Sequence, residues 1–301
     1  MEAAQQFYYA SHYRPLPHSP MPPPEIFDRT RLRHAREKTA PLFHAHDFLH
    51  RRAMADIVDR LESVTRSFER AAFYGVGELV DLLTPECGVG WTLHADLAAE
   101  RTDGRRPALV ADEERSPFAP ESLDLVVSLL TLHDANDLVG ALAQWRAALK
   151  PDGLFIAALF GEETLCELKS ALYRAESELA GGVSPRLPPF ASLKDLGSAL
   201  QRAGFALPVA DLDHVTVRYG EPLRLLKDLK GMGETNALKT RARPLGRRAI
   251  AQTLRQFAAE GGAARFDIVY LTGWAPHESQ PVPLKPGSAR RSLAEAVRKS
   301  G

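Results

Sequence analysis

Short apolar segments alternate with helical patterns through the middle of this 301-residue chain. The apolar segments are AAFYG, WTLHAD, PALVAD, LDLVVSLL and GLFIAALF, and helical stretches or turns separate most of them. This order is typical of β-α-β units around a parallel sheet. Val110–Asp112 and Val126–Leu130 show the continuous apolarity of strands that are covered on both faces. The pattern therefore predicts an α/β fold.

The segments that flank this alternating region divide the chain further. Residues 1–24 contain the proline-rich PLPHSPMPPP, which predicts a disordered tail. Residues 25–70 turn helical, with apolar side chains at helical spacing in FLHRRAMADIVDRL, and predict a helical N-terminal lid. We assign 71–277 to the main domain, with a helical insertion at about 220–262 between the last two strand candidates, HVTVRY and ARFDIVYLTGWA. Residues 278–301 are expected to form a C-terminal tail.

Composition excludes several classes of protein. Lys plus Arg and Asp plus Glu both number 38, so no global charge favours nucleic acid or an anionic membrane. The two cysteines, Cys87 and Cys166, exclude a disulfide scaffold and suit a reducing compartment. The longest apolar runs are too short to span a bilayer, and the N-terminus lacks a signal-peptide pattern. We therefore expect a cytoplasmic protein without a transmembrane segment.

Two Gly-x-Gly loops compete for the role of a nucleotide-binding loop. In a dinucleotide-like unit the glycine loop opens a helix, and a carboxylate ends the next strand about 20 residues later. Gly75 and Gly77 in FYGVGE satisfy this rule, because Asp96 lies 19 positions beyond Gly77 and leaves room for a helix at 78–85. In ECGVGW, Gly90 precedes Asp96 by six positions, which holds no helix. We therefore prefer the first loop.

Acidic residues end two successive strand candidates. Asp96 closes WTLHAD, and Asp112 and Glu113 follow PALV. Open parallel sheets bind ligands at the carboxyl ends of their strands, where Asp96 can accept hydrogen bonds from ribose hydroxyls and the other two from an adenine amine. The alternative is that these acids cap the helices that follow them.

Three longer motifs carry a family resemblance. VADEERSPFAPESLDLVVSLLTLHDANDL, LKPDGLFIAALFGEETLCELKSAL and MGETNAL resemble the class I S-adenosylmethionine-dependent methyltransferases. Within this superfamily the chain is most similar to the group that contains a respiratory complex I assembly factor with arginine hydroxylase activity and the biotin-pathway carrier-protein O-methyltransferases. The resemblance covers nearly the whole chain beyond the tail. It implies a Rossmann-like, seven-stranded sheet with an antiparallel last strand.

The resemblance also implies S-adenosylmethionine as cofactor and a set of residues around it. These residues are Gly75 and Gly77 at the methionine end, Asp96 at the ribose, Asp112 and Glu113 at the adenine, and Ser128 and Leu130 beside the sulfonium. The first loop departs from the family pattern, because Phe73 replaces its acid and Leu79 its third glycine. Losing a hydrogen bond to a charged group costs roughly 1.5–3 kcal/mol, which predicts weakened but retained cofactor binding.

Other candidate residues have open interpretations. His133, just past the fourth strand, either acts as a base or orients the substrate, or it caps a helix. His44, His46 and His50 have metal-like spacing, but no acid or cysteine pattern accompanies them, and we predict no metal site. A basic cluster either docks an acidic partner or is simply solvated. It comprises Lys239, Arg241, Arg243, Arg247 and Arg248.

Three functions follow from the resemblance. The first is methyl transfer to a protein substrate, such as a respiratory complex I subunit, and it needs no strong catalytic base because the sulfonium is already activated. The second is a chaperone for complex I assembly with little or no catalysis, which the altered first loop favours. The third is hydroxylation, which needs an oxidant and for which the sequence shows no iron-ligand set.

Overall fold

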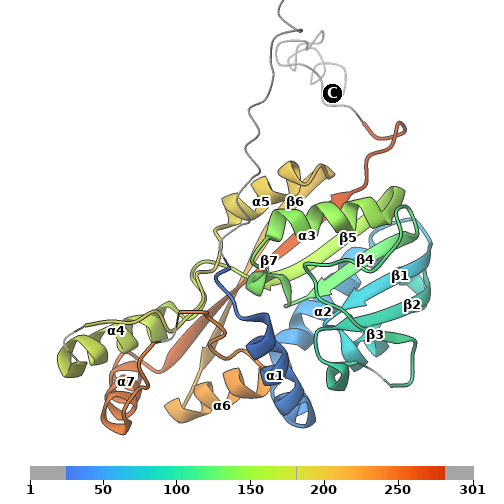
Figure 1. The fold of residues 1–301 in the computed structure, drawn as a ribbon. Helices are drawn as coiled ribbons and strands as arrows, with labels where there is room; N and C mark the ends of the chain where they lie inside the picture. Colours follow the sequence, from blue (N-terminus) through green and yellow to red (C-terminus); the bar gives the residue numbers. More distant parts are fainter. Residues whose placement is uncertain (1–24, 103, 181, 241, 282–301) are drawn as a thin grey trace, which may run out of the picture.

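The structure is a computed structural model that describes residues 25–102, 104–180, 182–240 and 242–281. The predicted tail at 1–24, most of the predicted tail at 278–301 and Arg241 lie outside the described residues. Seven strands form one sheet in the order β3-β2-β1-β4-β5-β7-β6 (Figure 1). The strands are β1 (Phe68–Tyr74), β2 (Val89–Asp96), β3 (Ala108–Val110), β4 (Leu123–Leu129), β5 (Leu149–Phe160), β6 (Ala206–Arg218) and β7 (Ala263–Trp274).

Strand direction confirms the predicted fold class. The strands β1 to β5 pair in parallel, whereas β7 runs antiparallel to both of its neighbours, β5 and β6. This is the Rossmann-like, seven-stranded sheet with an antiparallel last strand that the sequence predicted. The α-helices are α1 (Arg29–Thr39), α2 (Phe48–Glu62), α3 (Leu138–Ala148), α4 (Cys166–Ala180), α5 (Leu193–Arg202), α6 (Pro222–Met232) and α7 (Arg247–Ala259).

The helix expected at 78–85 is replaced by two short 3-10 helices, η2 (Gly77–Leu82) and η3 (Pro85–Cys87). Proline disfavours the α conformation of the residue before it, and Thr84 is accordingly extended, with φ of -97° and ψ of 163°. Leu79 and Val80 are nevertheless buried, so this segment still covers the core. The chain therefore crosses from β1 to β2 without a full α-helix.

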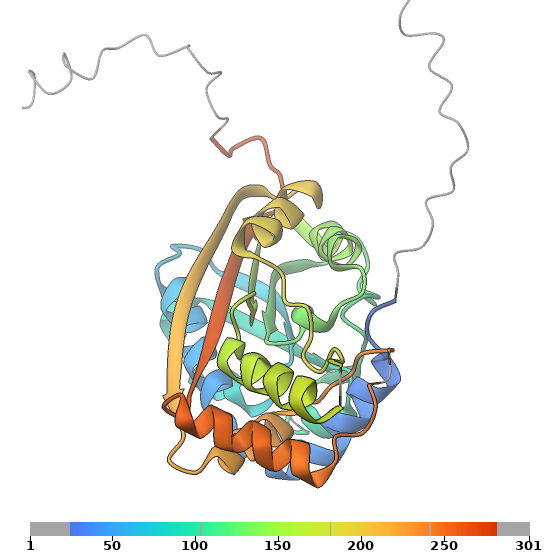
Figure 2. The same ribbon diagram turned by 90° about the vertical axis from the view of Figure 1, so that its left-hand side faces the viewer.

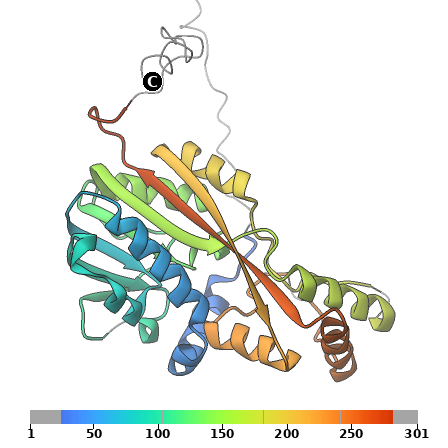
Figure 3. The ribbon, with the colours of Figure 1, turned by 180° about the vertical axis from the view of Figure 1, so that it is seen from behind.

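Apolar side chains on both faces of the sheet form two core clusters. On one face, α2 lies against the sheet (Figure 3), and its Leu49, Met54 and Ile57 belong to the first cluster. On the other face, α3 and α5 contribute Trp145 and Leu200. Full burial of one such side chain stabilises the fold by about 1.5–3 kcal/mol, so these helices fix the sheet that carries the site.

The last two strands extend beyond the parallel part of the sheet. Figure 2 shows the long strands β6 and β7 side by side, with α4 and α7 stacked against each other near their far end. The helix α6 follows β6 and ends at Gly233, whose left-handed φ of +91° turns the chain back toward the sheet. The segment after Gly233 thereby reaches the carboxyl edge of the strands.

The first helix, α1, is tied across this same edge. Oδ1 of Asn136, which follows β4, accepts hydrogen bonds from the backbone N–H groups of Ile26 and Phe27 at 2.7 and 2.8 Å. Phe27 also forms a β-bridge with Leu238, which lies beyond α6. The carboxylate of Asp28 caps α1 by accepting from its third residue at 3.1 Å. Contacts from two distant parts of the chain therefore position α1.

Candidate functional site

The glycine turn after β1 is required by close packing. Gly75 has a φ of +70°, and a Cβ atom built on it would lie 2.3 Å from the Thr131 side chain and 2.7 Å from the Leu129 carbonyl oxygen. Gly77 has a φ of +53°, and its Cβ would lie 2.9 Å from the Arg101 carbonyl oxygen. Only glycine fits both conditions. The turn therefore lies directly beside the ends of β1 and β4.

The acids expected at the strand ends converge at the same edge. Asp96 ends β2 and is buried, and its Oδ1 accepts from the backbone N–H of Ala98 at 2.9 Å. Asp112 and Glu113 follow β3, where Glu113 is fully buried and Asp112 is partly exposed. Burying a carboxylate costs several kcal/mol unless a positive group and hydrogen bonds compensate. Each acid at this edge therefore needs a cationic partner.

Helix α1 supplies those partners. Arg36 Nη1 donates to Glu113 Oε1 at 2.9 Å and lies 3.6 Å from Asp96 Oδ1. Arg29 Nη2 donates to Asp112 Oδ1 at 2.7 Å and also to Glu113. Both guanidinium groups thus occupy the hydrogen-bonding positions that the sequence assigned to a ribose and an adenine.

Burial and charge shift the pKa values in this cluster. Burial lowers the pKa of Arg36, but Glu113 and Asp96 outweigh this effect and raise it above its usual value. Burial raises the pKa of Asp96, although Arg36 and Arg101 oppose this. The pKa of Arg101 falls to about 10 because its burial outweighs the attraction of Asp96. The cluster is therefore a network of buried charges that depend on one another.

The residues expected beside a sulfonium lie at the end of β4. Ser128 is buried, and its hydroxyl is 2.8 Å from that of Thr131. Leu130 adopts a left-handed φ of +50°, and its N–H donates to the Ala158 carbonyl at 2.8 Å. Left-handed backbone is uncommon for a side chain of this kind and is typical of functional sites. The turn redirects the chain from β4 into η5 (Leu132–Asp134).

A second polar cluster forms where η5 meets the segment after α6. His133 Nε2 lies 3.1 Å from Glu234 Oε2 and 3.6 Å from Asp134 Oδ2. The His133 ring packs against Phe160 and Phe190, with centroid distances of 4.9 and 5.9 Å. Its side chain is only 1% exposed, so the imidazole is enclosed by carboxylates on one side and aromatic rings on the other.

The three groups of this cluster perturb one another. Burial lowers the pKa of His133, but the two carboxylates together raise it above its usual value. Burial raises the pKa of Asp134 to about 6, with His133 acting in the opposite direction. Burial also acts to raise the pKa of Glu234, but His133 and the nearby arginines lower it overall. Such shifts in a buried cluster at a sheet edge mark a candidate site.

Small cavities adjoin both clusters. One, of about 60 Å³, is lined by the glycine turn at 75–79, by Phe43 and by Arg101. The other, of about 40 Å³, is lined by Phe160, Phe190 and Glu234 among others. Ligand pockets of drug size measure about 300–1,000 Å³. Both cavities are therefore much smaller than such a pocket, and Arg29 and Arg36 of α1 are paired with the acids at this edge.

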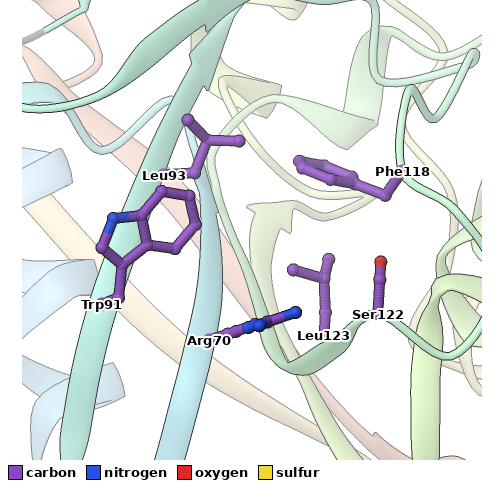
Figure 4. A pocket seen from close by; sticks show the side chains of 6 residues that line it. All are labelled: Arg70, Trp91, Leu93, Phe118, Ser122 and Leu123. Carbon is purple, nitrogen blue, oxygen red and sulfur yellow. The ribbon is translucent and has the colours of Figure 1, made fainter.

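A larger hollow lies elsewhere on the sheet. It has a volume of about 480 Å³ and is lined by Arg70, Trp91, Leu93, Phe118, Ser122 and Leu123 (Figure 4). Its lining is mainly apolar, and Arg70 is its one charged residue. It lies near the amino-terminal ends of β1 and β4, where no acid or histidine converges among the lining residues. We place the candidate site at the carboxyl edge, because the chemistry gathers there.

The other sequence candidates do not converge on a site. His44 pairs with Glu78 at 3.3 Å, His46 pairs with Asp228 at 2.7 Å, and His50 packs on the Phe43 ring. Of the basic cluster, Lys239 pairs with Glu25, and the Arg243 carbonyl accepts from Arg186 at 2.8 Å. Arg247 and Arg248 begin α7, and Arg241 lies outside the described residues. The loop ECGVGW opens β2, at the end of the strand opposite Asp96.

Comparison with known proteins shows the family and the fold of the chain. Residues 76–157 match the family model of a methyltransferase domain. The arginine-hydroxylase NDUFAF5 of Danio rerio is 37% identical over 90% of this chain and 89% of its own length, and that of Homo sapiens is 38% identical over 90% and 83%. The malonyl-[acyl-carrier protein] O-methyltransferase of a Methylovorus strain is 28% identical over 86% and 93%. The YcgJ protein of Bacillus subtilis shares the fold, with a TM-score of 0.51 at 13% identity over 75% of this chain and 99% of its own.

Fold and matched domain define a protein of the class I S-adenosylmethionine-dependent methyltransferase type, as the sequence motifs implied. Within this class, identity of 37–38% over nearly the full length of both chains places the protein in the NDUFAF5 family. The names of these relatives also correct one expectation. They are mitochondrial proteins, which contradicts the predicted cytoplasmic location. None of the described helices is both long and apolar enough to cross a membrane.

Sequence reasoning missed the residues that complete the site. Arg29 and Arg36 lie in the basic helix RTRLRHAREKT. This helix precedes the first strand, so the strand-end rule that located the acids does not apply to it. Glu234 lies in MGETNAL, a motif that carried the resemblance but suggested no role. Its position becomes clear only because Gly233 ends α6 beside η5. A search for acids flanked by a helix-ending glycine would have identified Glu234 as a candidate.

Proposed function

We propose that this protein binds S-adenosylmethionine at the carboxyl edge of the sheet and modifies an arginine of a protein substrate, a respiratory complex I subunit. The observation that carries the proposal is the convergence of the glycine turn with the acids that end β2 and β3. In this proposal each cofactor group has its own contacts. These are Gly75 and Gly77 for the methionine end, Asp96 for the ribose, Asp112 and Glu113 for the adenine, and Ser128 and Leu130 for the sulfonium.

Cofactor entry requires α1 to move, because the cavity beside the glycine turn holds only about 60 Å³. Arg29 and Arg36 would leave Asp112, Glu113 and Asp96, whose oxygens would then accept hydrogen bonds from the ligand. The same acids would thus pair with the arginines of α1 in the closed state and accept hydrogen bonds from the cofactor in the bound state. In this proposal α1, which lies within the lid predicted at 25–70, would open and close the crevice.

Hydroxylation of arginine is the first reaction that we propose, because relatives that are 37–38% identical over nearly their full length carry that name. One oxygen atom of dioxygen would enter a C–H bond of the side chain. The other would leave as water, with two electrons and two protons from an external donor. The bound cofactor would then order the crevice and keep its methyl group.

Methyl transfer is the second candidate, and the matched methyltransferase domain and the O-methyltransferase relatives support it. A guanidinium nitrogen would attack the methyl carbon, S-adenosylhomocysteine would leave, and the nitrogen would lose a proton. The proton would pass to solvent, and His133, which lies at the end of β4 and is paired with Glu234, is the proposed group that orients the substrate. Positioning would contribute most of the rate enhancement.

One experiment separates these reactions. The gene is deleted in its source, and arginines of the complex I subunits are analysed by mass spectrometry after growth with oxygen-18 gas or deuterated methionine. Hydroxylation gives an arginine with one labelled oxygen in the parent strain only, whereas methyl transfer gives a deuterated methyl group. Assembly that fails without either mark supports an assembly chaperone and contradicts both reactions.

Cofactor binding is tested separately by calorimetric titration of S-adenosylmethionine. Asp96→Asn removes a hydrogen bond to a charged group, for which we expect a loss of about 1.5–3 kcal/mol, or one to two decades in Kd. Asp213→Asn, on the exposed part of β6, is the matched control and leaves Kd unchanged. Absence of binding by the unaltered protein at millimolar ligand would refute the cofactor proposal.

A further inference from the structure

The cluster of His133, Asp134 and Glu234 has a feature that its ion pairs do not explain. The Asp134 side chain is 4% exposed, and the ion-pair partner of its carboxylate among the described residues is His133, whose own Nδ1 is buried without a hydrogen-bond partner there. The nearest cationic atom that contacts it is His133 Nε2, at 3.6 Å. A buried carboxylate normally has a charge or hydrogen-bond partner, because burial without one costs several kcal/mol. The same imidazole is already paired with Glu234 at 3.1 Å.

Distances in the cluster match those of metal ligands. The nitrogen and the two carboxylate oxygens all lie within 4.8 Å of one another. A zinc-sized ion bound at about 2.1 Å from nitrogen and oxygen ligands separates neighbouring ligand atoms by about 3.0–3.4 Å. The observed separations from Nε2 are 3.1 and 3.6 Å, and the two carboxylate oxygens lie within 4.8 Å of each other, so binding of an ion requires the carboxylates to rotate toward each other.

The charges also fit a dication. Two ionised carboxylates and one neutral imidazole neutralise a divalent ion, whereas a single proton on His133 neutralises only one of the two carboxylates within the cluster. Arg36 approaches the cluster, but its guanidinium is held by Glu113 at 2.9 Å and by Asp96. It therefore does not replace a cation at Asp134.

We propose that His133 Nε2, Asp134 and Glu234 bind one divalent first-row transition-metal ion. One imidazole and two carboxylates suit ions such as Mn²⁺, Fe²⁺ or Zn²⁺. Three protein ligands leave coordination positions for water or a substrate group, as in metal sites that act on small molecules. The cavity lined by Phe160, Phe190 and Glu234 adjoins the cluster and gives such a group a path to the ion.

The positions of these ligands follow from the fold. His133 and Asp134 are held by η5, the turn that leaves β4. Glu234 comes from the segment after α6, a hundred residues away in the sequence, and its N–H donates to the Leu229 carbonyl at 2.9 Å. The Gly233 turn thus fixes the third ligand before any ion binds. Such preorganisation is what a metal site needs.

The test is a titration of the full-length protein, treated with a chelator, with Mn²⁺ and no cofactor or substrate. Electron paramagnetic resonance of free Mn²⁺ gives the bound amount, and we expect one ion per chain. Asp134→Asn and Glu234→Gln keep the shape of each side chain, and each should weaken Kd by about 10–100-fold or more. His46→Ala is the matched control, because His46 pairs with Asp228 at 2.7 Å and belongs to no part of the cluster, and it should leave Kd unchanged.

A second readout covers variants that fold poorly. Pulsed electron paramagnetic resonance of the unaltered protein should show coupling of the bound Mn²⁺ to an imidazole nitrogen. This coupling should vanish in His133→Gln. Absence of binding up to millimolar Mn²⁺, binding equal in all variants, or a signal without nitrogen coupling would overturn the proposal. None of these results bears on the S-adenosylmethionine titration, so the two proposals fail independently.

Discussion

The buried pair between Arg36 and Glu113 should couple α1 energetically to the sheet. Arg36→Met and Glu113→Gln each remove one partner and leave the other with a single remaining contact, because Arg36 also faces Asp96 and Glu113 also accepts from Arg29. Breaking a buried pair costs about 3–5 kcal/mol, and the remaining contacts place these two changes near the lower end. With an unfolding entropy of about 2.1 cal/mol/K per residue, each kcal/mol lowers the Tm of a chain of 301 residues by about 1.6 °C.

A double-mutant cycle then isolates the pair itself. Urea unfolding of the parent, the two single variants and the double variant gives four free energies of unfolding, and for residues in contact we expect a coupling of about 1–3 kcal/mol. Arg52 and Asp213 form an exposed pair at 2.8 Å and serve as the control, for which about 0.2–1 kcal/mol is expected. If the costs of Arg36→Met and Glu113→Gln add to within about 0.5 kcal/mol, α1 is not seated on Glu113 and the description of the closed crevice is wrong.

Three further predictions concern separate parts of the structure. Gly75→Ala should destabilise the protein by about 2–4 kcal/mol, because it combines left-handed strain with a clash at the end of β4, whereas Gly104→Ala, which meets nothing within 4 Å, should be nearly neutral in the same urea assay. The pKa of Glu176 is lowered, because Arg186 outweighs the effect of its burial, so its stabilisation is present above pH 4.5 and is lost as pH falls below that value. Glu176→Gln should therefore reduce the loss of stability on acidification, and an unchanged acid limb would contradict this pairing. Asn136→Ala removes the acceptor of two backbone N–H groups, so hydrogen exchange in α1 should accelerate while exchange in α3 stays unchanged.

The sheet could be predicted because each strand is indicated by residues that are close together in the sequence. Strand-length apolar runs bounded by turns gave the order of the elements, and motif resemblance gave the antiparallel last strand. The spacing argument for FYGVGE also led to the loop that lies beside Asp96, since Gly75 N–H donates to the Ala95 carbonyl at 3.0 Å. The prediction of a helix at 78–85 was wrong, because Pro85 disfavours the α conformation at Thr84 and the helical pattern does not reveal this.

The composition of the site could not be predicted, because it depends on long-range contacts. Arg36 and Glu113 are 77 positions apart, and His133 and Glu234 are 101 apart. Neither pair leaves a periodic signal in the sequence. The acids were found because strand ends predict their location. Their partners lie on α1 and after the Gly233 turn, and only the packed structure shows where these segments lie.

The short strand β3 is the least stable edge of the proposed cofactor site. It pairs with β2 over only three residues, no strand of the described residues pairs with its outer edge, and Val110 is 56% exposed. Segments with so few buried contacts open locally at much lower free energy than the core. Glu113 follows β3 closely, so the ion pairs of α1 with Glu113 also stabilise this edge of the sheet. Release of α1 should therefore destabilise β3 at the same time. Ligand entry and local unfolding of this sheet edge would then be coupled.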